Sequence, residues 1–132
     1  MKYNYLIKIE YLGNNFVGWQ KQKNGRSIQG LIEKTLSKIF KSKIKINGSG
    51  RTDAGVNAWG QYANFLCNNE IKNTFQTLTT INFFLKKYPI SVVTIKKKNT
   101  KFHARHSAKK RLYEYLITNR KAKLTIDKDR SW

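Results

Sequence analysis

The residues best suited to chemistry lie in one glycine-rich segment, residues 48–58, which reads Gly-Ser-Gly-Arg-Thr-Asp-Ala-Gly-Val-Asn-Ala. The chain has only seven acidic residues against 27 Lys and Arg, and one of the seven, Asp53, follows Arg51 by two positions. The three glycines allow a tight turn and let a second molecule approach the backbone closely. A carboxylate displayed there can attack an electrophile covalently or stabilise an electron-poor carbon.

Arg51 and Thr52 complete the candidate centre around Asp53. Residues i and i+2 of extended backbone share a face, so the guanidinium of Arg51 is predicted to pair with Asp53 and keep it ionised and oriented. Thr52 is expected to stabilise the turn. Two plainer interpretations stay open: Asp53 as a turn aspartate bonded to its own backbone, and Arg51 as a simple phosphate-binding arginine.

Five sequence blocks carry a resemblance to a known family. They are Phe16-Val17-Gly18-Trp19-Gln20, Gly50-Arg51-Thr52-Asp53-Ala54-Gly55-Val56, Gly60-Gln61 with Phe65, Phe102-His103-Ala104-Arg105, and Arg111-Leu112-Tyr113-Glu114-Tyr115. In order and approximate spacing, these blocks resemble the tRNA pseudouridine synthases of the TruA type. The resemblance runs along nearly the whole chain but matches only the N-terminal half of the family's protein. The second half of such a protein adds a basic residue and an apolar wall to the pocket.

The resemblance implies an activity, a substrate and a set of roles. Such an enzyme isomerises uridine to pseudouridine in the anticodon stem-loop of tRNA, uses no cofactor and no metal, and acts as a homodimer. Asp53 would be the essential catalytic residue, Arg51 its orienting partner, and Tyr113 the ring that packs against the target base. Tyr113 alternates with Tyr115 and Ile117, so a core position for it also stays open; the family position favours Tyr115 as the packing residue.

Two basic clusters, around residues 20–26 and 102–111, resemble regions of the family that face tRNA. The predicted substrate-binding residues are Tyr113, Gln20, Lys21, Arg26, Thr52, His103, Arg105, Lys110 and Arg111. Each charge run, taken alone, is also typical of a solvated face. His103 and His106 have no cysteine or acidic residue near them in the sequence, so no metal site is expected.

The overall composition also favours an RNA partner. A formal net charge of +20 calls for an anionic ligand, and seven Tyr, seven Phe and three Trp offer stacking faces for bases. AT-rich coding DNA is an alternative source for part of the lysine excess. The chain contains no run of about eighteen apolar residues, so no membrane-spanning helix is predicted. The single cysteine, Cys67, has no internal disulfide partner and is expected in the core, which suits a reducing, cytoplasmic location.

Hydrophobic periodicity predicts an α+β fold, a mostly antiparallel sheet with two helices on one face. The expected strands are 3–11, a short piece at 16–20, 43–47, 57–66, 90–95 and 112–118, and the expected helices are 28–40, capped by Ser27, and 74–87. Lys96 to Lys98 are expected in an exposed turn. Residues 1–118 are expected to form the catalytic domain, and residues 119–132 a crossover towards a second domain. Two alternatives stay open: a non-catalytic RNA-binding half-domain, or a truncated fragment of such an enzyme.

Overall fold

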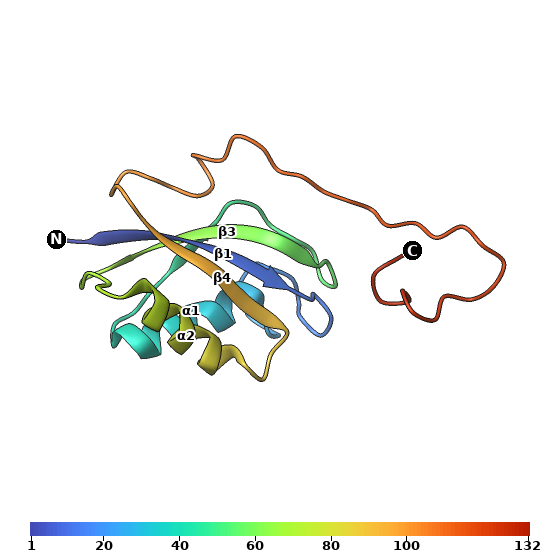
Figure 1. Cartoon of the computed structure of the whole chain (residues 1–132), viewed down its shortest axis with the longest axis horizontal. Helices are drawn as coiled ribbons and strands as arrows, with labels where there is room; N and C mark the ends of the chain where they lie inside the picture. Colours follow the sequence, from blue (N-terminus) through green and yellow to red (C-terminus); the bar gives the residue numbers. More distant parts are fainter.

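The computed structural model describes all 132 residues. Its elements are β1 (Tyr3–Tyr11), α1 (Ile28–Phe40), β2 (Ile46–Gly48), β3 (Ala58–Cys67), α2 (Thr74–Leu85) and β4 (Ile90–Lys98). The four strands form one antiparallel sheet in the order β2-β3-β1-β4, and both helices lie against one face of it (Figure 1). The predicted α+β class, with two helices on one face, is confirmed.

The central strand β1 organises the core. Its alternating residues Tyr5, Ile7, Ile9 and Tyr11 are buried, which confirms the predicted strand and its buried face. The core continues through α1, α2, β3 and β4 in Ile28, Ile32, Leu36, Phe65, Cys67, Ile81, Leu85, Val92 and Ile95. Burial of each large apolar side chain contributes about 1.5–3 kcal/mol, so this single cluster accounts for much of the stability of the fold.

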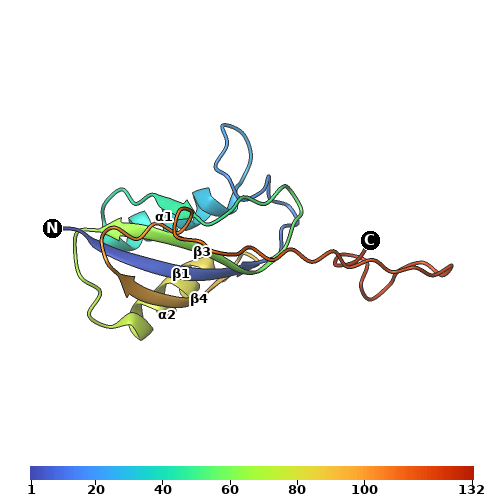
Figure 2. The ribbon, with the colours of Figure 1, turned by 90° about the horizontal axis from the view of Figure 1, so that it is seen from above.

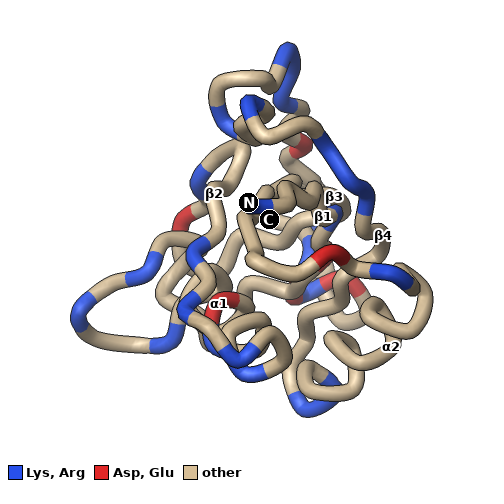
Figure 3. The backbone as a smooth tube through the Cα atoms, turned by 90° about the vertical axis from the view of Figure 1, so that its left-hand side faces the viewer, with Lys and Arg blue, Asp and Glu red and all other residues tan.

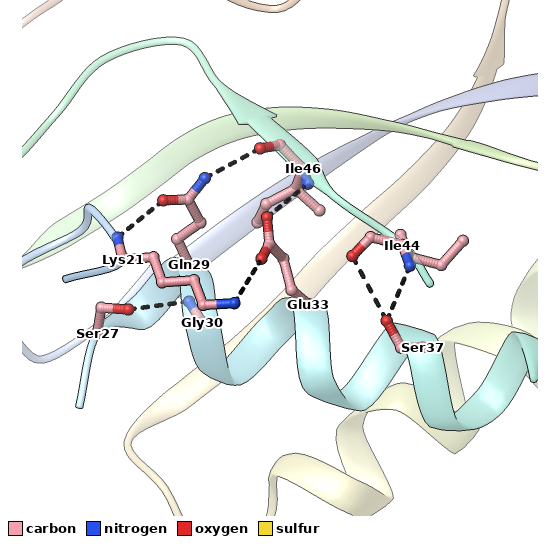
Figure 4. A network of polar contacts seen from close by, with 8 residues as sticks. All are labelled: Lys21, Ser27, Gln29, Gly30, Glu33, Ser37, Ile44 and Ile46. Atoms are coloured by element: carbon pink, nitrogen blue, oxygen red, sulfur yellow. Dashed lines mark hydrogen bonds and ion pairs between the residues drawn. The ribbon is translucent and has the colours of Figure 1, made fainter. Parts of the chain in front are cut away.

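Helix α1 does more than cover the sheet, because its side chains also hold the edge strand β2 (Figure 4). The helix begins after Ser27, whose Oγ accepts a hydrogen bond from the Gly30 amide at 3.0 Å, as predicted for an N-cap. One helical turn apart, Gln29 Nε2 donates to the Ile46 carbonyl at 3.1 Å and Glu33 Oε1 accepts from the Ile46 amide at 3.0 Å. These side chains satisfy backbone groups that would otherwise remain unpaired at a sheet edge.

Several of the expected strand and helix boundaries differ from those of the structure. Residues 16–20 form bends and no strand, although Phe16 and Trp19 are buried in the core. The expected strand 43–47 is displaced to β2, since its first residues are bound by α1 instead of by β3. Lys96 to Lys98 belong to β4 because they pair with β1. Helix α2 ends at Leu85, two residues before the expected end at residue 87.

The expected strand 112–118 is also wrong. These residues have no hydrogen-bonded neighbour in the sheet, and Figures 1 and 2 show the chain leaving the sheet before it reaches them. Tyr115 is 89% exposed, so the expectation that it packs in the core is wrong as well. An alternating pattern predicts a strand only if a partner strand lies beside it, and this chain offers none there.

The last residues fold back on themselves at a distance from the sheet (Figure 1). The Trp132 amide donates to the Leu116 carbonyl and the Thr118 amide donates to the Trp132 carbonyl, both at 2.7 Å. Neither helix is long and apolar enough to cross a membrane.

Replacement of Glu33 tests the link between α1 and β2. Glu33→Ala should lower the free energy of unfolding by about 1–3 kcal/mol, because it leaves the Ile46 amide without a partner in a buried place. Glu33→Gln, which keeps an acceptor oxygen, should lose much less. Urea denaturation of the two variants and the wild type measures the difference. Equal stability of Glu33→Ala and wild type would show that this bond does not hold β2.

Candidate active site

The segment that connects β2 to β3, residues 49–57, is called the site loop here because it carries Asp53. The Ser49 amide donates to the Tyr62 carbonyl at 2.7 Å, which continues the β2–β3 pairing by one residue. Further on, the Val56 amide donates to the Asp53 carbonyl at 3.1 Å and closes a turn. Gly55, with φ +83°, occupies the third position of this turn, where a type II turn needs a positive φ. Asp53 therefore begins the turn, and its side chain is exposed.

Thr52 fastens the middle of the site loop to the sheet. Its carbonyl accepts a hydrogen bond from the Trp19 amide at 3.0 Å, and its hydroxyl bonds the Tyr11 hydroxyl at 2.7 Å. The pKa of Tyr11 is raised above its usual value, mainly because its hydroxyl is buried. Tyr113 raises this pKa slightly further, whereas hydrogen bonds to Thr52 and Gln61 partly offset the effect. The Tyr11 hydroxyl thus stays protonated at neutral pH and remains available as a hydrogen-bond donor.

Gln61 of β3 fastens the beginning of the site loop. Its Nε2 donates to the Gly50 carbonyl at 2.6 Å, and its Oε1 accepts from the Ser49 hydroxyl at 2.8 Å. The side chain is buried, so both bonds are sheltered from water. The sequence predicts no site role for Gln61, which lies in one of the five blocks, or for Tyr11, which is predicted only as a strand residue. The available signal was its spacing, because Gln61 alternates with Ala63 and Phe65 and so shares their buried face of the strand.

An open cleft of about 620 Å³ lies beside the site loop. Six of the predicted site residues line it: Gln20, Arg51, His103, Arg105, Arg111 and Tyr113. Gln29 and Ser49 also line it and were not predicted. The lining contains three arginines and no acidic residue, so the cleft favours an anionic ligand such as an RNA phosphate. The cleft lining does not include Asp53, Thr52, Lys21, Arg26 or Lys110.

The expected pair between Arg51 and Asp53 is not formed. The three ion pairs of the structure are Lys21–Glu33, Lys97–Glu70 and Arg130–Asp127. Residues 51–53 are not a strand, and Asp53 begins a turn, so the i, i+2 rule for extended backbone does not apply to them. The carboxylate of Asp53 is therefore exposed and free of an ion-pair partner.

His103 shapes the turn on the far side of the cleft. Its Nδ1 accepts a hydrogen bond from the Arg105 amide at 3.2 Å, and its carbonyl accepts from the Ser107 amide at 2.7 Å. Partial burial lowers the pKa of His103, and His106 and Arg105 lower it further. A neutral ring suits the acceptor role of Nδ1.

No group of three potential His, Cys, Asp or Glu ligands is brought together anywhere in the structure.

Three of the predicted basic contacts lie outside the cleft. The Nζ of Lys21 lies 3.8 Å from Oε2 of Glu33, and the guanidinium of Arg26 lies 5.1 Å from the centre of the Tyr88 ring. Lys110 is exposed. Lys and Arg are found on all sides of the backbone, with few acidic residues among them (Figure 3). A long anionic ligand could therefore meet positive charge well beyond the cleft.

The sequence matches the model of the tRNA pseudouridine synthase family over residues 7–107, which is most of the chain. The chain belongs to this family. It is 52% identical over 130 residues to the tRNA pseudouridine synthase A of Pelagibacter ubique, and 48% identical over 129 residues to that of Ehrlichia ruminantium. A third relative, from Neorickettsia sennetsu, is 43% identical over 128 residues.

The family match has a definite extent. The alignments cover 97–98% of this chain but only 52–53% of the three relatives. The chain thus spans about half the length of the curated synthases it matches. Within residues 7–107, the match to the synthase family includes the site loop and the turn at His103, which face the same cleft.

Two glycines test how the site loop is seated. A Cβ added at Gly18, which has φ +110°, would lie 2.7 Å from the Thr52 carbonyl oxygen, whereas one at Gly55 would meet nothing within 4 Å. Both Gly→Ala changes strain the backbone by about 1–2 kcal/mol. Gly18→Ala should cost a further 1–3 kcal/mol or so, because it also overpacks the loop anchor. Urea unfolding compares the two, and equal costs would argue against tight seating of Thr52 on Gly18.

Proposed function

We propose that this protein isomerises uridine to pseudouridine in tRNA, with Asp53 as the catalytic carboxylate. In this reaction the C1′–N1 bond of the uridine breaks and a C1′–C5 bond forms. The hydrogen of C5 leaves to solvent, and N1 gains a proton. The observation that carries the proposal is an exposed, unpaired carboxylate on a well-anchored loop. The first residues of this loop, Ser49 to Arg51, line a cleft that contains three arginines and no acidic residue.

Asp53 is suited to this reaction because its carboxylate is not engaged by the protein. An ion-paired or buried carboxylate would have to break its contacts before it could reach the nucleotide. The loop backbone on either side is fixed, through Thr52 on one side and the turn to Val56 on the other. A positioned but unengaged group is what nucleophilic or electrostatic assistance at the sugar or the pyrimidine ring requires.

Arg51 and Tyr113 take the supporting roles in this proposal. Arg51 lines the cleft and has no acidic partner, so it can bind a phosphate next to the target uridine or turn to Asp53 once RNA is bound. Tyr113 also lines the cleft and is 57% exposed, which leaves part of its ring available to a base. Taking a uridine out of its stack costs about a few kcal/mol of free energy, and stacking of the base on the Tyr113 ring would offset part of that cost.

The finer parts of the proposal rest on the resemblance to the TruA type. They are the anticodon stem-loop as substrate, action as a homodimer and a cytoplasmic location. The same resemblance gives the proposed division into a catalytic domain, residues 1–118, and a crossover towards a second domain, residues 119–132. Neither a cofactor nor a metal is needed, since the isomerisation only exchanges bonds and protons.

A second candidate function is a non-catalytic RNA-binding half-domain. The observation that favours it is that three arginines line the cleft, whereas Asp53 does not. It predicts tRNA binding that weakens steeply with salt, as phosphate contacts require. It also predicts no pseudouridine formation by the protein expressed from its own gene.

Asp53→Asn decides between these functions, because it removes the charge and keeps the shape. Release of tritium from tRNA labelled at uridine C5 should fall by more than about 10³-fold, while the tRNA Kd should change little. Asp129→Asn is the matched control, since Asp129 is also exposed and has no ion-pair partner. Unchanged tritium release in Asp53→Asn would overturn the catalytic role of Asp53. Tight binding without tritium release in the wild type would favour the half-domain.

A further inference from the structure

We infer that Arg111 is a positioning residue, which docks the segment that carries Tyr113 onto the site loop, and that it does not act as a phosphate contact. The inference deepens the proposed function, because it concerns the placement of the ring that would stack on the target uridine. It departs from the expectation that Arg111 belongs to the tRNA-binding cluster.

The guanidinium of Arg111 is already bound by two carbonyl groups of the protein. Its Nε donates to the Ser49 carbonyl at 2.7 Å, and its Nη2 donates to the Arg105 carbonyl at 3.1 Å. Ser49 begins the site loop and Arg105 lies in the turn across the cleft. One planar side chain thus joins three segments, and one edge of its donor set is occupied before any RNA arrives.

These two bonds are the only hydrogen bonds between residues 108–117 and the residues that precede them. The segment has no strand partner, and most of its side chains are exposed. No other polar contact therefore fixes where the segment lies relative to the site loop.

Tyr113 lies two residues after Arg111 and reaches the same point of the site loop. A Cβ added to Gly50 would lie 3.4 Å from Arg111 Cδ and Nε and 3.5 Å from the Tyr113 hydroxyl oxygen. The two side chains thus lie beside each other at Gly50, whose carbonyl accepts a hydrogen bond from Gln61 Nε2 at 2.6 Å. The position of the Tyr113 ring follows from the position of Arg111.

Replacement of Arg111 by Lys or by Ala separates positioning from phosphate binding. Lys keeps the positive charge but has no planar fork that can reach both carbonyls. A positioning role predicts that both variants lower kcat by about ten-fold or more, since displaced groups lose on the order of 10²-fold per ångström. The tRNA Kd and its salt dependence should stay within about three-fold of wild type.

A phosphate contact predicts the opposite pattern. Arg111→Lys would then stay close to wild type, and Arg111→Ala would weaken tRNA binding and reduce the salt slope by about one. That outcome would overturn the inference. Lys121→Ala, which removes an exposed charge of the last segment, serves as the control and should leave kcat unchanged.

A measurement without tRNA keeps this test independent of the proposed function. In the ligand-free protein, the NMR amide signal of Gly50 should shift in Arg111→Lys towards its position in Tyr113→Ala, because both variants take the tyrosine ring away from Gly50. An unshifted Gly50 signal in Arg111→Lys would overturn the inference. If the signal shifts while Asp53→Asn remains active, the docking stands and the catalytic proposal fails.

Discussion

The architecture of the site depends on the hydrogen bonds between α1 and the short edge strand β2. β2 has only three residues, too few to hold a loop in place by sheet pairing alone. Glu33 and Gln29 bind both backbone groups of Ile46, so the helix acts as the missing neighbour of the strand (Figure 4). The direction in which the chain enters the site loop is set by this contact.

The site loop combines a rigid backbone with an exposed acidic side chain. Thr52 is fixed to Tyr11 and Trp19, and the loop start is fixed to Gln61, so each backbone anchor comes from the sheet or from the bend before α1. The contacts that order the loop are thus made by its backbone and by the side chains of Ser49 and Thr52, and the carboxylate of Asp53 has no protein partner. This division suits a group that must meet its ligand before it acts.

Ion pairing separates Asp53 from three of the other six acidic residues. Glu33, Glu70 and Asp127 are each paired with a nearby cation, whereas Asp53 is unpaired in a chain of net charge +20. The arginines of the cleft are used in different ways. Arg111 is engaged by two carbonyls, while Arg51 has no acidic partner. Positive residues with the same formal charge can therefore hold the site together or remain available to an anionic ligand.

The sequence by itself determined the strand 3–11, the helix 28–40 with its Ser27 cap, and the glycine-rich loop around Asp53, because periodicity, capping and turn chemistry act between near neighbours. It could not determine the fate of residues 112–118, since a strand depends on a partner strand far away in the chain. Nor could it show that Arg51 and Asp53 stay apart or that Arg111 binds Ser49. Those contacts are decided by where separate segments meet, and only the tertiary structure contains that information.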